Sequence, residues 1–145
     1  MAFEIGKYNN MKVSVFGNPD LEEDNLIVKL IPELKKKFPK IEFRLEDPVE
    51  GLKPPPAAAV WAIIDVGKNL DEIRVVDDVD KIEEKRRVSL HDYGVGMELK
   101  LLKKLGKVKR IKIIVVPMEM KEKKALERVT GVLREIIPRE LRHKY

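Results

Sequence analysis

The spacing of apolar residues changes several times along the chain, and each change marks a predicted element. Residues 12–16 (KVSVF) predict a strand that ends at the turn residues 17–19. Residues 26–34 carry apolar side chains at helical spacing, so they predict a helix. Pro32 removes a backbone donor, and we expect it to kink or interrupt that helix. Residues 41–45 predict a second short strand.

The middle and the end of the chain supply three more predicted strands. Residues 59–65 (AVWAIID) form a continuous apolar run, which is typical of a central strand covered on both faces. Residues 72–77 (EIRVVD) predict a shorter, half-buried strand at an edge. Residues 110–117 (RIKIIVVP) predict the last strong strand.

Two further helices are predicted around that last strand. The first carries an apolar stripe and stops at Gly106, which stands where a C-terminal cap belongs. The second precedes Pro138. The stripe of the first consists of Val95, Leu99, Leu102 and Leu105, and the inward side of the second of Leu126, Val129, Leu133, Ile136 and Ile137.

This order of elements predicts an α/β fold. We expect a three-layer sandwich with a mostly parallel, twisted sheet of about five strands, one of them reversed, and helices on both faces. Its 145 residues are enough for one sizeable core. Residues 1–145 are therefore predicted to be a single domain, with residues 1–10 as an N-terminal extension and 139–145 as a tail.

Composition excludes several classes of protein. The chain has no cysteine, so disulfides, thiolate metal sites and thiol nucleophiles are excluded. Its longest apolar runs are strand-sized and fall short of the roughly 20 residues that span a membrane. The first ten residues (MAFEIGKYNN) lack the apolar segment of a secretory signal. We therefore expect a cytoplasmic protein with no membrane partner.

The charge pattern is that of helix surfaces rather than of a nucleic-acid interface. The net charge of +5 could indicate a nucleic-acid binder. However, 25 acidic residues are interleaved with the lysines, and aromatic residues that could stack on bases are few. We expect no nucleic-acid partner. A small basic nucleic-acid-binding domain remains an alternative, and it would bind with a steep dependence on salt.

Metal-capable side chains stand where several predicted strands end. Asp24 lies in the segment after the first strand, Asp65 ends the central strand, and His91 ends the run before the second helix. Because ligands collect outside the carboxyl ends of the strands in open sheets, these side chains are expected to converge. Two carboxylates and one imidazole would suit a borderline divalent metal such as zinc, iron, cobalt or nickel.

Each of these residues also has a structural explanation when taken alone. Asp24 could complement a helix dipole, Asp65 could cap the turn DVGKN, and His91 could form a hydrogen bond in a loop. His143, in the tail, is not expected to take part. The convergence of the three residues at one sheet edge favours the metal site.

The usual catalytic motifs are absent from the sequence. There is no G-x-S-x-G elbow, no H-E-x-x-H helix, no phosphate-binding P-loop and no G-x-G-x-x-G after the first strand. A hydrolase built from this chain would therefore use carboxylates, a metal, or a metal brought by the substrate.

Four stretches together resemble the hydrogenase maturation endopeptidases. They are VFGNPDLEED, AIIDVGKNLDEIRVVD, VSLHDYGVGMELKLLKKLG and RIKIIVVPMEM, and the resemblance runs from Met11 to about Ile137. It implies that Asp24, Asp65 and His91 bind nickel. Where that family often has glycine and a G-P step, this chain has Asn25 and LIVKLIP, so Glu23 could replace Asp24 as the ligand.

The activity implied by the resemblance is proteolytic. Enzymes of that family remove a C-terminal extension from the large-subunit precursor of nickel-iron hydrogenase after nickel has been inserted. The partner would be that precursor, the nickel would come from the substrate, and the resting enzyme would be metal-free. Asp47 or Glu50 could approach the substrate. A non-catalytic chaperone of the same fold that binds metal or precursor is the alternative, and the oligomeric state is not predicted.

Overall fold

The protein is built on one five-stranded sheet. The computed structural model describes residues 11–17, 25–77, 79 and 93–137. The described elements are β1 (Met11–Phe16), α2 (Asn25–Lys37), β2 (Glu42–Glu46), the 3-10 helix η2 (Pro48–Glu50), β3 (Val60–Gly67), β4 (Arg74–Val76), α3 (Tyr93–Lys104), β5 (Arg110–Pro117) and α4 (Glu122–Ile136).

The strand order in the sheet is β2-β1-β3-β5-β4. The first four strands in this order are parallel, and β4 pairs antiparallel with β5 at the far edge. The predicted α/β fold, with a mostly parallel five-stranded sheet and one reversed strand, is confirmed. The apolar run of residues 59–65 does form the central strand, and residues 74–76 lie at an edge.

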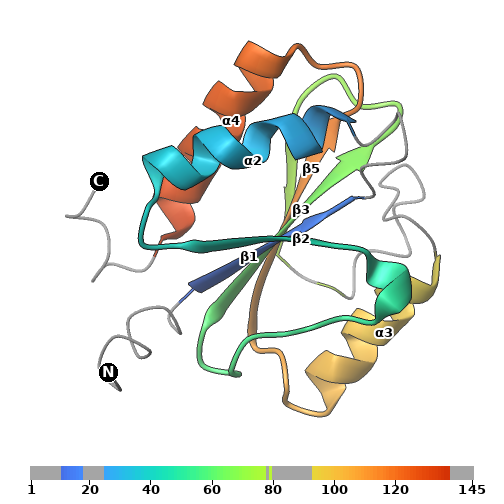
Figure 1. Ribbon diagram of the computed structural model, residues 1–145. Coiled ribbons are helices and arrows are strands. Elements are labelled where there is room, and N and C mark those ends of the chain that lie inside the picture. The colour runs from blue at the N-terminus through green and yellow to red at the C-terminus, as the bar shows by residue number, and fades with distance from the viewer. Residues whose placement is uncertain (1–10, 18–24, 78, 80–92, 138–145) are drawn as a thin grey trace.

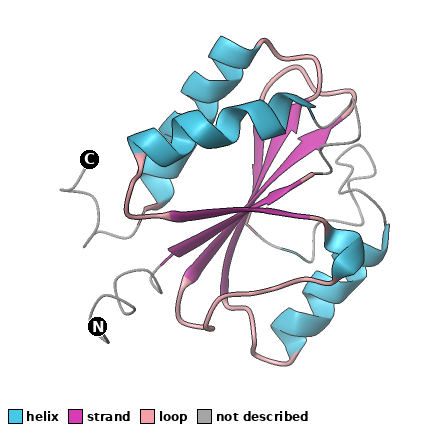
Figure 2. Cartoon of the chain, viewed as in Figure 1, coloured by secondary structure: helices cyan, strands magenta, loops and turns pink. Residues whose placement is uncertain are grey.

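Helices pack against the sheet from two sides (Figures 1 and 2). Helices α2 and α4 cover the side that we call the apolar face, where alternate residues of β1, β3 and β5 meet the two helices. Helix α3 lies on the opposite side, which we call the mixed face. The buried apolar side chains of the mixed face include Phe16, Trp61, Ile63, Val95, Leu99, Ile113 and Val115.

The interruption expected at Pro32 is wrong. Helix α2 continues through Pro32, which is exposed. The proline costs the helix one backbone hydrogen bond, to the carbonyl of Val28. Burial of Ile27, Leu30 and Leu34 against the apolar face fixes both halves of the helix, so tertiary packing overrides the local preference.

The cap predicted at Gly106 is confirmed. Gly106 has a φ of 75°, its N–H donates to the carbonyl of Lys103, and the N–H of Lys107 donates to the carbonyl of Leu102. These are the two hydrogen bonds of a Schellman motif. Leu105 departs from the predicted stripe, because it is 60% exposed while Val95 and Leu99 are buried. None of the described helices is long and apolar enough to cross a membrane.

Candidate functional site

Asp65 is a fully buried carboxylic acid in the central strand. It lies two residues before Gly67, the last residue of β3, and its exposure is 0%. One carboxyl oxygen, Oδ1, accepts a hydrogen bond of 2.8 Å from the N–H of Val66. Fully buried acids are rare in proteins, so Asp65 is a candidate for a functional role.

The neighbouring strands fix the position of Asp65 at the carboxyl edge of the sheet. Asp65 lies opposite Val115 of β5, and the register that pairs Val15 with Ile64 puts Phe16, the last residue of β1, level with it on the other side. A side chain on Gly67 would bring a Cβ within 2.5 Å of Cγ1 of Val115. The glycine therefore permits the close packing of β3 and β5 beside the acid.

The other predicted ligands lie outside the described residues. Asp24, its possible substitute Glu23, and His91 belong to segments 18–24 and 80–92. Asp24 directly precedes α2, and His91 stands two residues before α3. Both helices begin on the side toward which the parallel strands run (Figure 1). Within the described part of the chain, no three histidine, aspartate or glutamate side chains form a metal-binding group, so the three-residue site stays a prediction.

Asp47 and Glu50 lie together on the connection after β2. Asp47 is the N-cap of η2, and its Oδ1 accepts a hydrogen bond of 3.0 Å from the N–H of Val49. This contact satisfies one of the free amides at the start of the short helix. Glu50 is exposed in η2. The structure thus gives Asp47 a capping role.

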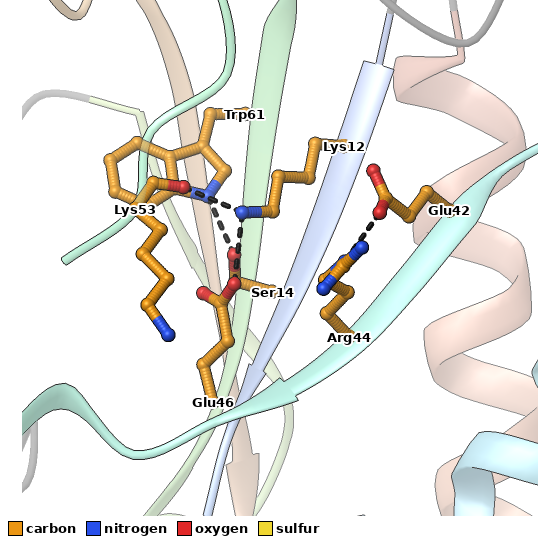
Figure 3. A network of polar contacts seen from close by, with 7 residues as sticks. All are labelled: Lys12, Ser14, Glu42, Arg44, Glu46, Lys53 and Trp61. Carbon is orange, nitrogen blue, oxygen red and sulfur yellow. Dashed lines mark hydrogen bonds and ion pairs between the residues drawn. The ribbon is translucent and has the colours of Figure 1, made fainter. Parts of the chain in front are cut away.

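The sequence did not reveal a buried ion pair on the mixed face (Figure 3). Nζ of Lys12 lies 2.8 Å from Oε2 of Glu46, and the two side chains are only 11% and 6% exposed. The same ammonium donates a hydrogen bond of 2.6 Å to the carbonyl of Lys53. This pair joins β1 to β2 and holds the loop after η2 against the sheet.

A second polar contact extends the network toward the central strand. Nε1 of Trp61 donates a hydrogen bond of 2.8 Å to Oγ of Ser14, and both residues are buried (Figure 3). Lys12 and Ser14 lie two residues apart in β1, so their side chains point to the same face of the sheet. This spacing in the sequence indicates a shared face, but it does not identify the partners, Glu46 and Trp61, which lie on other strands.

An open cavity of about 250 Å³ lies beside this network. On its wall Arg44 pairs with Glu42 of the same strand. The hydrogen bond with Glu42 raises the pKa of Arg44 further above its ordinary value. The lining residues are Lys12, Glu42, Arg44, Glu46, Lys53, Pro54, Pro55 and Pro56. Because the cations and the carboxylates pair with each other, the cavity wall is largely neutralised.

The sequence matches no protein-family model and no curated protein. Solved structures do match. The NiFe hydrogenase maturation protease HybD from Thermococcus kodakarensis is 17% identical, with a TM-score of 0.63, over 89% of this chain and 99% of that chain. The hydrogenase maturating endopeptidase HybD from E. coli is 19% identical, with a TM-score of 0.63, over 90% of this chain and 98% of that chain.

A third structure agrees with these two. The Hydrogenase 3 maturation protease is 21% identical, with a TM-score of 0.54, over 83% of this chain and 87% of that chain. Near-complete coverage at such low identity indicates a shared arrangement of strands and helices. The resemblance noted in the sequence is thereby confirmed at the level of the fold: this chain has the fold of the hydrogenase maturation endopeptidases.

Proposed function

We propose that this protein is a cytoplasmic endopeptidase that removes the C-terminal extension of a nickel-iron hydrogenase large-subunit precursor after nickel insertion. The observation that carries the proposal is the buried Asp65 at the carboxyl edge of a fold shared with maturation endopeptidases. Fully buried acids are rare in proteins, and Asp65 lies at the sheet edge where ligands collect in open parallel sheets, so it is a candidate functional residue.

In this proposal Asp24, Asp65 and His91 engage the nickel that the precursor already carries. Two carboxylates and an imidazole are suitable ligands for nickel, and they would recognise the metal as part of the substrate. Hydrolysis adds water across the scissile peptide bond: oxygen joins the carbonyl carbon, the C–N bond breaks, and a proton passes to the departing amine. A carboxylate of the site or a water molecule polarised by the metal would assist this step.

The complete burial of Asp65 adds a requirement to this mechanism. Its carboxylate has no exposure in the chain by itself, so nickel can reach it only if neighbouring groups move aside when the precursor binds. We therefore expect a rearrangement of the carboxyl edge on binding. This would also keep the acid away from metal ions in solution, and the resting enzyme would then be metal-free.

Mass spectrometry of a nickel-loaded precursor tests the proposal. The precursor is incubated with the unmodified protein, and a parallel sample contains precursor without nickel. The expected result is loss of a C-terminal peptide from the nickel-loaded precursor alone. If nothing is cleaved while the folding and the nickel content of the precursor are verified, the protein is a binding protein or acts on a different substrate. Binding without cleavage would then identify the chaperone alternative.

Single substitutions test the residues. Asp65→Asn keeps the size of the side chain and the oxygen that accepts from Val66, so the fold should persist while processing is lost. Asp24→Asn and His91→Ala are expected to abolish processing as well, and Glu23→Gln is the matched control for Asp24. Loss of processing in Glu23→Gln but not in Asp24→Asn would reassign that ligand to Glu23. Unchanged processing by the Asp65→Asn variant would contradict the assignment of this acid.

A further inference from the structure

An unpartnered apolar stripe follows the outer side of α3. Met97, Leu101 and Leu105 are 53%, 55% and 60% exposed, and they account for half of the large apolar side chains that are exposed among the described residues. Residues four apart in a helix lie on one side of it. Leu105 continues the last turn, because its N–H donates to the carbonyl of Leu101.

The opposite side of the helix packs in the core, so the stripe faces away from the sheet. On its inner side Val95 and Leu99 are buried in the core of the mixed face, and Leu102 packs against them. The Schellman cap at Gly106 fixes its end. Leu101 and Leu105 keep more than half of their surface exposed to solvent. A contiguous apolar surface of this kind is typical of an interaction site.

The charges around the stripe restrict its partner. Residues 98–110 contain one acid, Glu98, and six basic residues. Lys100 and Lys103 already interact with other groups of the chain, so the positive charge offered to a partner comes chiefly from Lys104, Lys107 and Lys109. A complementary surface would therefore present apolar side chains with carboxylates around them. A second copy of this chain does not fit, because two surfaces of the same strong positive charge would face each other. A lipid surface is a weaker fit, because the stripe has no aromatic side chain.

The place of the stripe in the fold connects it with the proposed site. Helix α3 begins on the side toward which the parallel strands run, and from there the stripe extends by roughly 12 Å, at 1.5 Å of rise for each residue. Met97 lies one turn after Tyr93, the first residue of the helix. A protein that delivers a peptide to the carboxyl edge of the sheet can therefore rest along α3 at the same time.

From these observations we infer that the outer side of α3 is the docking surface for the hydrogenase large-subunit precursor, through an apolar patch of the precursor surrounded by carboxylates. This inference rests on the proposed function for the identity of the partner. It adds a second area of contact that is separate from the nickel. Binding would then depend on the folded precursor, while cleavage would depend on the nickel as well.

Binding of the nickel-loaded precursor to the immobilised full-length protein is the direct test. The Leu101→Gln/Leu105→Gln double variant removes the stripe with residues that favour helices. It should weaken binding about tenfold or more, because central apolar contacts dominate interface energies. Val75→Thr is the matched control: Val75 is 43% exposed on β4, at the sheet edge, and its affinity should stay within about twofold of that of the unmodified protein. An unchanged affinity of the double variant overturns the inference.

Two further experiments distinguish the precursor from a lipid surface and from a second copy of the chain. Lys104→Glu/Lys107→Glu should weaken binding most at low salt, since the attraction between exposed charges is screened by salt. The protein alone is also tested by sedimentation equilibrium, and with vesicles of phosphatidylglycerol and phosphatidylcholine. One contrary outcome is that the leucine double variant loses vesicle binding or dimer formation while its precursor binding is unchanged. This outcome would assign the stripe to lipid or to a second copy of the chain, and it would overturn the inference.

Cleavage is measured separately by mass spectrometry in the same samples. If the unmodified protein binds the precursor through the stripe but does not cleave it, the docking surface stands and the proposed peptidase fails. If the unmodified protein does not bind the precursor, the docking surface is overturned whatever the result of the cleavage assay. The circular dichroism spectra of the variants should match that of the unmodified protein, because all the substituted side chains are exposed.

Discussion

The two faces of the sheet are built by different means. The apolar face buries a continuous cluster of aliphatic and aromatic side chains beneath α2 and α4. On the mixed face, α3 covers an apolar cluster, while β1 and β2 carry the buried ion pair of Lys12 with Glu46 and the hydrogen bond from Trp61 to Ser14. Trp61, Ile63 and Asp65 occupy every second position of β3, so Asp65 also points to the mixed face.

The two faces contribute to stability by different interactions, and the candidate site lies on only one of them. The strands of the apolar face contribute only apolar side chains to its cluster, so its role is to hold the sheet together. The mixed face contains the predicted ligand of β3, the polar network and the helix with the exposed stripe. Its polar groups are acceptable because each is paired with a specific partner. Substitutions on the two faces should therefore lower the free energy of unfolding for different physical reasons.

The largest loss of stability is expected from Glu46→Gln. This change leaves the ammonium of Lys12 buried without its counter-charge, and breaking a buried pair in this way costs about 3–5 kcal/mol. The free energy of unfolding can be measured by urea titration. The double variant Lys12→Met/Glu46→Leu is the control: it replaces both charges with apolar groups, and its stability should return close to that of the unmodified protein. A double variant as unstable as the single one would show that the pair itself does not determine the effect.

A comparison of two helical leucines gives the next largest effect. Leu133 of α4 is 0% exposed and Leu101 of α3 is 55% exposed. Leu133→Ala should lower the free energy of unfolding by about 2–5 kcal/mol, because it leaves a cavity in the apolar face. Leu101→Ala should change it by less than about 0.5 kcal/mol, as is usual for surface substitutions. Similar losses in both variants, measured by urea titration, would contradict the assignment of α3's outer side to solvent.

A smaller loss is expected from Ser14→Ala. The indole N–H of Trp61 would lose its acceptor inside the mixed face, and an unsatisfied buried donor costs about 1–3 kcal/mol. In the double variant Ser14→Ala/Trp61→Phe the donor is removed as well, and the coupling between the two substitutions measures the hydrogen bond. Additive losses in thermal unfolding would show that the bond contributes nothing.

The smallest effect concerns an exposed carboxylate. Glu72 accepts from the N–H of Ile73 and pairs with Arg128 and Lys124 of α4, and these contacts lower its pKa below the ordinary value of 4.5. Its contribution to stability is therefore present above pH 4.5 and is lost as the pH falls through the lowered pKa. Glu72→Gln should slightly lower the melting temperature at neutral pH, and the difference should disappear in acid. Glu119→Gln is the control, and a difference for Glu72→Gln that does not change with pH would contradict the ion pairs.

The elements of the fold were predictable because they depend on local periodicity. The apolar run of β3 is one unbroken stretch of sequence, and the glycine cap lies directly after α3. Both predictions are confirmed. The interruption considered at Pro32 does not occur, because packing of α2 against the sheet outweighs one lost hydrogen bond. Leu105 was assigned to the inner stripe because it is apolar, although its angular position at the end of α3 turns it to solvent.

The candidate site was predictable only in part. Asp65 was selected because it ends an apolar run, and it does lie buried at the carboxyl edge of the sheet. Its convergence with Asp24 and His91 stays a prediction, because both lie outside the described residues. The pairing of Lys12 with Glu46 could not be predicted, since the two residues become neighbours only through the order of β1 and β2 in the sheet.

The strand order also has a consequence for synthesis on the ribosome. Strand β4 (Arg74–Val76) pairs with β5 (Arg110–Pro117), which emerges later and inserts between β3 and β4. Until then one side of β3 and the whole of β4 lack their hydrogen-bonded neighbour, and α4 has not yet been made. The nascent chain therefore exposes one side of the apolar strand β3 until β5 has been translated, and this is the stage at which we expect chaperones to bind it.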